Sequence, residues 1–290
     1  MPGWHTSTRC CTEPSIPTAD GTTRLDRALL DRDLARSRNQ ARSMIISGQV
    51  SINGRPARRV AEPVRAEDRL EVSDDDASSR GYVSRAALKL LGALDDLELR
   101  VCGRALDAGA STGGFTQVLL ERGCDEVVAV DVGHGQLDDR IRGDSRVVVW
   151  ERTNLRDLTL HHVDHRQVDL VVADVSFISL TLLVRPLTSV LSPAGSLLLM
   201  VKPQFEVGRD RLGKGGVVRS EQLHRDAVAQ VVAAAEEVGW HPQAVVRSRL
   251  PGPAGNVEFF VLFRRAEPRC RVDIGSVTGA AYAVAGDRTT

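Results

Sequence analysis

The stretch 104–115, which reads RALDAGASTGGF, constrains the fold of this chain more than any other segment. A short apolar run ends there at Asp107 and passes directly into a glycine-rich turn that opens a helix-like sequence. A second apolar run, 127–130, also ends at a carboxylate, Asp131. Strand, glycine-rich turn, helix and a second strand that ends in an acid are typical of a doubly wound α/β sheet that binds a nucleoside. We therefore predict an α/β fold with a nucleoside pocket at this turn.

The glycine spacing restricts the ligand of this pocket. Glycines let the backbone approach a ligand closely, and the Asp131 carboxylate can accept hydrogen bonds from ribose hydroxyls. The turn matches neither the lysine-containing triphosphate loop nor the strict G-x-G-x-x-G dinucleotide pattern. Because Asp107 would repel a pyrophosphate but suits an ammonium and a sulfonium, we expect S-adenosylmethionine as the cofactor. An ordinary strand–turn–helix connection is the alternative, and it would not call for an acid at position 131. The residues expected to contact the cofactor are Asp107, Gly109, Ser111, Gly113, Phe115, Asp131 and Asn154, with Asn154 or Asp174 nearer the adenine end.

Lysine is rare in this chain. Only three of the 38 basic side chains are lysine, at positions 89, 202 and 214, and the other 35 are arginine. Arginine is not deprotonated at accessible pH, whereas a lysine in a dry or cationic pocket can lose its proton and act as a base. Lys202 ends the apolar run 196–201, where α/β sheets carry their chemistry, and Lys89 lies in a helix before the glycine-rich turn. Lys214, which lies among glycines, is better explained as a cation of a mobile loop.

Two carboxylates accompany these lysines at the ends of predicted strands. Asp174 ends the run 168–174 and Glu258 begins the run 258–264, so both can meet Lys89 and Lys202 at one sheet edge. Two lysines between two carboxylates suit removal of a proton from a sugar hydroxyl, because one ammonium lowers the pKa of the other lysine. Methylation of an exocyclic amine or a ring carbon would call for an Asn/Asp-Pro-Pro-aromatic turn or a cysteine, and neither follows the run 168–174. The alternative is that each lysine forms a surface ion pair, which is plausible for Lys89 alone.

Composition excludes several classes of protein. The formal net charge of the 290 residues is zero, so any attraction to nucleic acid must be local. The five cysteines form no C-x-x-C pair, which indicates reduced thiols rather than a disulfide or zinc framework, and we expect no metal. No apolar run reaches the ~20 residues that cross a bilayer, and the N-terminus has no signal-peptide core. We expect a cytoplasmic protein without a membrane partner.

The chain divides into five predicted segments. Residues 1–22 read as a disordered extension, 23–73 as a small α+β unit, 74–82 as a linker, 83–266 as the α/β domain, and 267–290 as an unassigned tail. In the small unit we predict two short helices, a strand at 50–52 and a turn at Asn53-Gly54. In the α/β domain Ser84 is expected to cap a helix, and another helix is expected at 220–239. The predicted strands are 104–107, 126–131, 146–150, 168–174, 196–202, 243–249 and 258–264.

Positive charge concentrates in the small unit. Residues 24–72 contain eleven arginines against seven acidic residues, a local excess of 11 − 7 = 4 in a neutral chain. Arg38 and Arg42 are four residues apart and share one helix face, which gives an electrostatic surface suited to RNA phosphates. A merely solvated helix face is the alternative. The residues expected to bind RNA are Arg24, Arg36, Arg38 and Arg42.

Six motifs in one order resemble a known family over residues 23–265. They are 35–38 (ARSR), 82–85 (YVSR), 106–116, 174–179 (DVSFIS), 201–206 (VKPQFE) and 251–258 (PGPAGNVE). The sequence resembles the TlyA family, the so-called hemolysin family of ribosomal RNA 2′-O-methyltransferases with an FtsJ-like catalytic domain. Two departures stand out: Tyr82 occupies a linker position where the family typically has tryptophan, and the extension before Arg24 is long.

The resemblance implies a Rossmann-like methyltransferase sheet preceded by an S-four-type RNA-binding domain. It also implies that Lys89, Asp174, Lys202 and Glu258 form a catalytic tetrad. The implied substrates are cytidine 2′-hydroxyls in ribosomal RNA of the large subunit, and in some members also of the small subunit, with no stable protein partner. Two other functions remain open at this point: a non-catalytic ribosome-assembly factor that binds RNA, and a membrane-active hemolysin.

Overall fold

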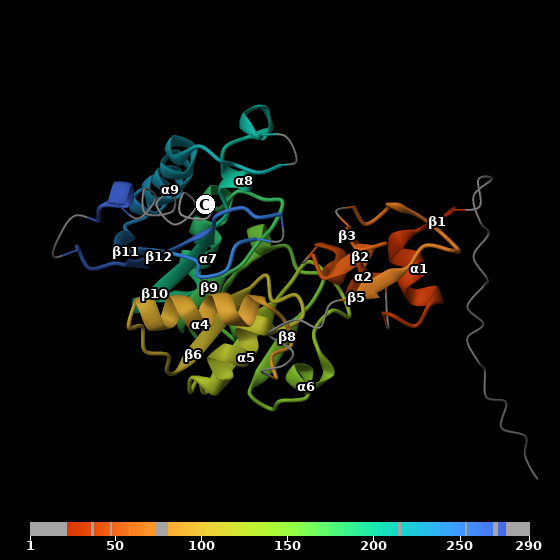
Figure 1. Ribbon diagram of the computed structural model, residues 1–290. Coiled ribbons are helices and arrows are strands. Elements are labelled where there is room, and N and C mark those ends of the chain that lie inside the picture. The colour runs from red at the N-terminus through yellow and green to blue at the C-terminus, as the bar shows by residue number, and fades with distance from the viewer. Residues whose placement is uncertain are drawn as a thin grey trace, which may run out of the picture.

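The structure is a computed structural model that describes residues 22–35, 38–46, 48–57, 59–72, 81–213, 216–252, 254–268 and 272–276. Its described part forms a small N-terminal unit and a larger α/β domain, which appear as separate bodies in Figure 1. Each has its own hydrophobic core. Residues 1–21 of the predicted extension, most of the predicted linker and Lys214 lie outside the described residues, whereas Thr22, predicted as the end of the extension, begins a strand.

The N-terminal unit packs two helices against short antiparallel strands. Helix α1 (Leu25–Asp31) and helix α2 (Arg38–Ile46) bury Leu25, Leu29, Ala41 and Ile45 against each other and the strands. The predicted hairpin is confirmed: Asn53 and Gly54 both have positive φ, 52° and 75°, as the tight turns of β-hairpins require. Strand β1 (Thr22–Arg24) pairs with β4 (Pro63–Arg65), and β2 (Val50–Ile52) pairs with β3 (Arg55–Pro56) and with β5 (Leu70–Val72).

The α/β domain is built on a seven-stranded sheet with the order β11-β12-β10-β9-β6-β7-β8. All pairings are parallel except those of β12, which runs against both of its neighbours. After β6 the chain adds β7 and β8 on one side of this strand, and it then crosses over and adds β9 on the other side. The strand order therefore reverses between β6 and β9. Doubly wound sheets bind ligands at the carboxyl ends of the strands at such a point. The strands are β6 (Arg104–Ala108), β7 (Glu126–Val130), β8 (Val147–Trp150), β9 (Val168–Ala173), β10 (Leu191–Val201), β11 (His241–Arg247) and β12 (Phe259–Arg264).

Helices cover both faces of this sheet, as predicted (Figure 1). Alternate residues of a strand face opposite sides: in β9, Leu170 and Val172 pack with α4 and α5, whereas Val171 and Ala173 pack with α7 and α9. The helices are α4 (Ala86–Asp96), α5 (Gly114–Glu121), α6 (Asp139–Arg142), α7 (Val184–Ser189), α8 (Pro203–Glu206) and α9 (Glu221–Glu236). Short 3₁₀ segments are η1 (Leu155–Asp157), η2 (Leu160–Val163), η3 (Leu180–Leu182) and η4 (Arg209–Arg211). Among the described residues, no helix combines the length and apolar character needed to span a membrane.

Three details differ from the sequence predictions. Ser84 does not cap α4: its hydroxyl is buried without a hydrogen-bond partner among the described residues, because it packs against the start of α5 at Gly114. Strand β10 begins at Leu191, five residues before its predicted start, and its register shifts before Ser196. In the tail that had no prediction, Val272 and Ile274 pack against the core of the α/β domain.

Candidate active site

The glycine-rich turn crosses the carboxyl ends of three strands. Gly109 and Ala110 donate backbone hydrogen bonds to the Val130 carbonyl at 2.8 and 3.1 Å, and Asp174 donates to the Ala108 carbonyl at 3.1 Å. Gly109 has a φ of +90°, and a Cβ atom there would lie 2.6 Å from the Asp174 carbonyl oxygen. Any side chain would push the turn away from the end of β9. Glycine at position 109 therefore sets the close approach of the turn to Asp174.

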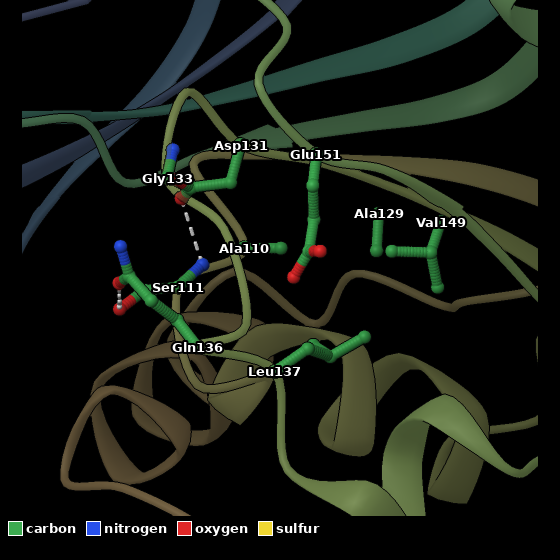
Figure 2. A pocket seen from close by; sticks show the side chains of 9 residues that line it. All are labelled: Ala110, Ser111, Ala129, Asp131, Gly133, Gln136, Leu137, Val149 and Glu151. Carbon is green, nitrogen blue, oxygen red and sulfur yellow. Dashed lines mark hydrogen bonds between the residues drawn. The ribbon is translucent and has the colours of Figure 1, made fainter. Parts of the chain in front are cut away.

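A shallow hollow, open to solvent, lies between this turn and the ends of β7 and β8 (Figure 2). The Asp131 carboxylate forms one rim of the hollow. Its Oδ2 accepts the Ser111 N–H at 2.9 Å and its Oδ1 accepts the Gly133 N–H at 2.6 Å. Each carboxylate oxygen has a second lone pair, so Asp131 can still accept hydroxyl donors while the backbone fixes its orientation.

Glu151 forms a second acidic group at the hollow, and the sequence analysis missed it. Although burial opposes ionisation, hydrogen bonds from Arg142, Gly135 and His134 lower the pKa of the Glu151 carboxyl. The Glu151 side chain projects into the hollow above Leu137 in the view of Figure 2. Glu151 directly follows β8, so the rule that identified Asp131, an acid at the end of an apolar run, would also have found it. The remaining lining is mainly apolar: Ala110, Ala129, Leu137 and Val149, with Gln136 at the edge.

The other predicted cofactor residues lie in different surroundings. Asp107 is fully buried beneath the turn, where Thr116 Oγ1 donates to its Oδ2 at 2.6 Å. Burial raises the pKa of Asp107 to about 7. The Phe115 side chain lies in the core against Phe260, with ring centroids 6.2 Å apart, so only its backbone can face a ligand. Asn154 is exposed, and its Oδ1 accepts the Arg156 N–H at 3.1 Å at the start of η1.

The groups that line the hollow and its surroundings are chemically suited to an adenosine group attached to a cationic tail. Apolar side chains can pack on a flat base, and Asp131 can accept ribose hydroxyls. Oδ1 of Asp107 is buried with no hydrogen-bond partner among the described residues, which leaves an acceptor for a positively charged group beneath the turn. The donor set is thus consistent with the predicted cofactor.

Two ion pairs lie at the carboxyl edge of the same sheet, one of them buried and the other partly exposed at its carboxylate. Lys89 Nζ lies 2.6 Å from Glu258 Oε2, and the side chains are only 9% and 1% exposed. Lys202 Nζ lies 2.6 Å from Asp174 Oδ1 and donates to Ser176 Oγ at 2.9 Å. The antiparallel register of β10 and β12 pairs Val201 with Phe259, so its continuation sets Lys202 opposite Glu258. The four predicted residues therefore share one edge of the sheet.

The segments that follow β9 and β10 contact each other beside Lys202. The Glu206 carboxylate accepts the Leu180 N–H at 2.9 Å and the Ser179 hydroxyl, and burial raises the pKa of Glu206. The Phe177 and Phe205 rings contact each other with centroids 5.1 Å apart. Phe177 is 73% exposed and has a φ of +67°. The sequence analysis quoted this motif without assigning a role to the exposed ring.

The predicted RNA-binding arginines lie on the N-terminal unit. Arg24 and Arg38 both contact the Asp26 carboxylate, at 3.0 and 3.2 Å. Arg42 is exposed on α2. Arg36 lies outside the described residues.

Comparison with known proteins defines the class of this protein. Residues 82–265 match the FtsJ-like methyltransferase family, and residues 23–70 match the S4 domain. The chain is 51% identical over 247 residues to the 16S/23S rRNA (cytidine-2′-O)-methyltransferase TlyA of Mycobacterium tuberculosis H37Rv, covering 85% of this chain and 91% of that protein. Hemolysin A of Brachyspira hyodysenteriae is 33% identical, covering 83% of this chain and 99% of that protein. A solved structure from Streptococcus thermophilus, described as a hemolysin, superposes with a TM-score of 0.69 at 32% identity, covering 91% of this chain and 97% of that chain.

The fold and the matched domain define an FtsJ-like methyltransferase with an S4 domain. More particularly, the chain belongs to the TlyA family, which confirms the resemblance found in the sequence.

Proposed function

We propose that this protein transfers a methyl group from S-adenosylmethionine to the 2′-hydroxyl of cytidine in ribosomal RNA. The observation that carries the proposal is the buried ion pair Lys89–Glu258 together with the pair Lys202–Asp174 at the sheet edge next to the glycine-rich turn. A buried charge is costly unless it is paired, so three buried charged groups and a partly exposed fourth at one sheet edge point to a chemical role.

The hollow beside the turn supports the choice of cofactor. When bound, S-adenosylmethionine supplies an electrophilic methyl group. We propose that Asp131 binds its ribose hydroxyls, that Asp107 lies beneath its cationic end, and that Glu151, Asn154 and the backbone from Gly109 to Phe115 complete the site. This arrangement would direct the methyl group toward the edge where Lys202 lies.

Lys202 is our candidate for the base. An ammonium group has no lone pair, so Lys202 can accept the proton of a ribose hydroxyl only in its neutral form. Asp174 and Ser176 hold its Nζ atom in place, while Lys89 and Glu258 form the second ion pair at the same sheet edge. Because a ribose hydroxyl is a very weak acid, positioning of the hydroxyl against both Nζ and the methyl group should account for much of the rate.

The RNA substrate is supported by three features. The S4 domain carries the basic surface, and the M. tuberculosis relative is named for cytidine 2′-O-methylation of 16S and 23S rRNA. The exposed Phe177 ring, which contacts Phe205 beside Lys202, can stack on a base. We propose ribosomal RNA or a ribosomal subunit as the partner. The cytoplasmic location expected from the sequence agrees with this substrate and stays a prediction.

The test is transfer of labelled methyl from S-adenosylmethionine to unmodified ribosomal subunits, followed by mapping of the modified nucleotide. The expected product is a 2′-O-methylcytidine, and RNA with a 2′-deoxy nucleotide at the mapped position should accept no methyl group. Methylation of the deoxy substrate would show that the base is the acceptor. RNA binding without any turnover would favour a non-catalytic assembly factor.

A further inference from the structure

Glu206 is a carboxylate close to the candidate base Lys202, and it takes no direct part in the proposed reaction. It is the last residue of α8, which directly follows Lys202. Its Oε1 accepts the Leu180 N–H at 2.9 Å, and its Oε2 accepts the Ser179 hydroxyl. Among the described residues no basic side chain forms an ion pair with it. A carboxylate that is partly buried without a cation depends on its hydrogen bonds, so these two bonds are what holds Glu206 in place.

Both donors lie in one segment, 174–180, which also contacts the candidate base. At the start of this segment, Asp174 Oδ1 lies 2.6 Å from Lys202 Nζ, and Ser176 Oγ accepts a hydrogen bond from the same Nζ atom at 2.9 Å. The last two residues of the segment donate to Glu206. The segment is thus tied at both ends to the chain that follows β10, to Lys202 at one end and to Glu206 at the other.

The backbone between these two ties has a conformation that needs support. Phe177 has a φ of +67°, which residues with a side chain rarely adopt, and its ring is 73% exposed. A residue persists in this conformation only where its surroundings hold it. The Phe205 ring contacts the Phe177 ring, and Glu206 fixes the backbone three residues later, at Leu180. Without the Glu206 bonds the segment can relax toward a commoner backbone conformation, which would displace Ser176.

We propose that Glu206 is a positioning residue for methyl transfer, which holds the segment 174–180 in the conformation that sets Ser176 against the Nζ atom of Lys202. The inference rests on the proposed function, in which Lys202 is the base. Glu206 acts through Ser176 and does not touch the reacting atoms. Because a displacement of about 1 Å can cost on the order of 10² in rate, a carboxylate outside the reacting groups can control the chemical step.

Two substitutions of Glu206 distinguish its hydrogen bonds from its charge. Glu206→Ala removes both acceptors, whereas Glu206→Gln keeps an oxygen for the Leu180 N–H and brings an amide that can donate to Ser179 Oγ. In a single-turnover assay with saturating S-adenosylmethionine and unmodified ribosomal subunits, we expect Glu206→Ala to slow methyl transfer by about 10- to 100-fold. Glu206→Gln should keep most of the rate. Calorimetry should find the wild-type cofactor affinity in both variants.

A double-mutant cycle tests the route through Ser176. Ser176→Ala removes the contact to Lys202 Nζ and should slow the reaction by itself. If Glu206 acts through this contact, Glu206→Ala/Ser176→Ala should be as slow as the slower single variant, within a factor of about two. Losses that multiply would show two independent effects and would overturn the proposal. A wild-type rate for Ser176→Ala would overturn it as well, because the contact would then carry nothing.

Glu126 offers a matched control at the opposite edge of the sheet. It is the first residue of β7, its side chain is 23% exposed, and it pairs with Arg104 and, at 3.3 Å, with Arg166. Glu126→Ala should lower the melting temperature but leave the single-turnover rate of the folded protein unchanged. Equal rate losses in Glu126→Ala and Glu206→Ala would contradict the proposal, because a general loosening of the domain would explain both.

The outcomes separate this inference from the proposed function. Methyl transfer by the wild-type protein together with a wild-type rate in folded Glu206→Ala would reject only the inference and leave Glu206 as a structural residue. An inactive wild-type protein would reject the proposed function and the inference with it. Thermal unfolding checks each variant. If Glu206→Ala does not fold, Ser179→Ala removes one of the two hydrogen bonds from the other side and takes its place in the cycle with Ser176→Ala.

Discussion

At the residue scale, the scarcity of lysine identified two of the four residues at the candidate site. The sequence predicted that Lys89, Asp174, Lys202 and Glu258 meet, and the structure brings them to one edge. Which lysine pairs with which carboxylate was beyond the sequence, because it depends on the insertion of β12 between β10 and β11. The role of each residue in the reaction stays a prediction.

Replacement of Lys202 by arginine tests its role as the base. Lys202→Arg keeps the positive charge beside Asp174 but cannot accept a proton, so we expect methyl transfer to slow by on the order of 10² or more. Single-turnover transfer of labelled methyl measures the chemical step, and calorimetry should find the cofactor still bound. Near-normal turnover would show that proton removal is not the task of Lys202.

The buried Asp107 predicts an unusual dependence of stability on pH. Its pKa is raised by burial to about 7 from an ordinary 3.8, so between these values the folded protein binds a proton that the unfolded chain has released. The free energy of unfolding should therefore fall as pH rises through this window, and it should stay at its lower value above pH 7. Asp107→Asn should remove this dependence, so that between pH 5 and 8 its stability relative to the wild type rises by roughly 2–3 kcal/mol.

Asp144 provides the control for this measurement. The Arg146 side chain holds the pKa of Asp144 at about 2, so its stabilisation is lost only as pH falls through the acidic range. Asp144→Asn should shift stability by the same amount at pH 5 and pH 8. Urea unfolding at both values makes the comparison, and equal pH profiles for wild type and Asp107→Asn would contradict the assignment.

At the element scale, the strands followed from apolar runs that end in charged or polar residues. Six of the seven sheet strands lie within about two residues of their predicted bounds. For the parallel strands β6, β7, β8 and β9 the reason is that buried parallel strands are nearly continuous apolar segments. The seventh, β10, starts earlier than predicted because Pro193 and Gly195 interrupt its apolar pattern. The Ser84 prediction was wrong since capping depends on local φ and ψ, which a serine in the sequence does not reveal.

Replacement of Gly109 by alanine tests the close approach of the turn to β9. Gly109→Ala meets both an unfavourable φ and the Asp174 carbonyl, so we expect ~2–5 kcal/mol of destabilisation. Gly239→Ala is the matched control, because Gly239 has a φ of +76° with nothing within 4 Å of its Cβ position, and it should lose only ~1–2 kcal/mol. Chemical unfolding of both variants measures the difference, and equal losses would show that the turn can move away from β9.

At the scale of the whole molecule, the net charge of zero is unevenly distributed, because the small unit is basic and the rest of the chain balances its charge. The sequence revealed this local excess and the class of its partner. It did not reveal the buried carboxylates that hold the arginines, because an acidic residue looks the same in a sequence whether it is buried or exposed. Burial of Asp26 and Glu62 follows only from the backbone pairing of residues 25–26 with 60–62.

Removal of Arg38 and Arg42 tests whether the small unit provides affinity rather than chemistry. The double variant Arg38→Ala/Arg42→Ala should bind ribosomal RNA more weakly and with a flatter salt dependence, since each phosphate contact releases about one counterion. Cofactor affinity should stay unchanged, because the predicted cofactor residues lie in the other domain. Arg100→Ala/Arg122→Ala removes the same charge from the α/β domain, and an equal loss of RNA binding there would contradict a dedicated RNA surface.

The pairing of Lys89 with Glu258 joins residues that are 169 positions apart in the chain. Glu258 reaches the site because β12 runs antiparallel, so the residue before this strand lies at the same edge as the residues after β9 and β10. During synthesis the glycine-rich turn, Asp131 and both lysines emerge first, and the last carboxylate arrives only when the sheet is nearly complete. A polypeptide that ends before Glu258 would thus contain every residue that lines the hollow but only three of the four charges of the proposed catalytic site, so we expect methyl transfer to require the chain through Glu258.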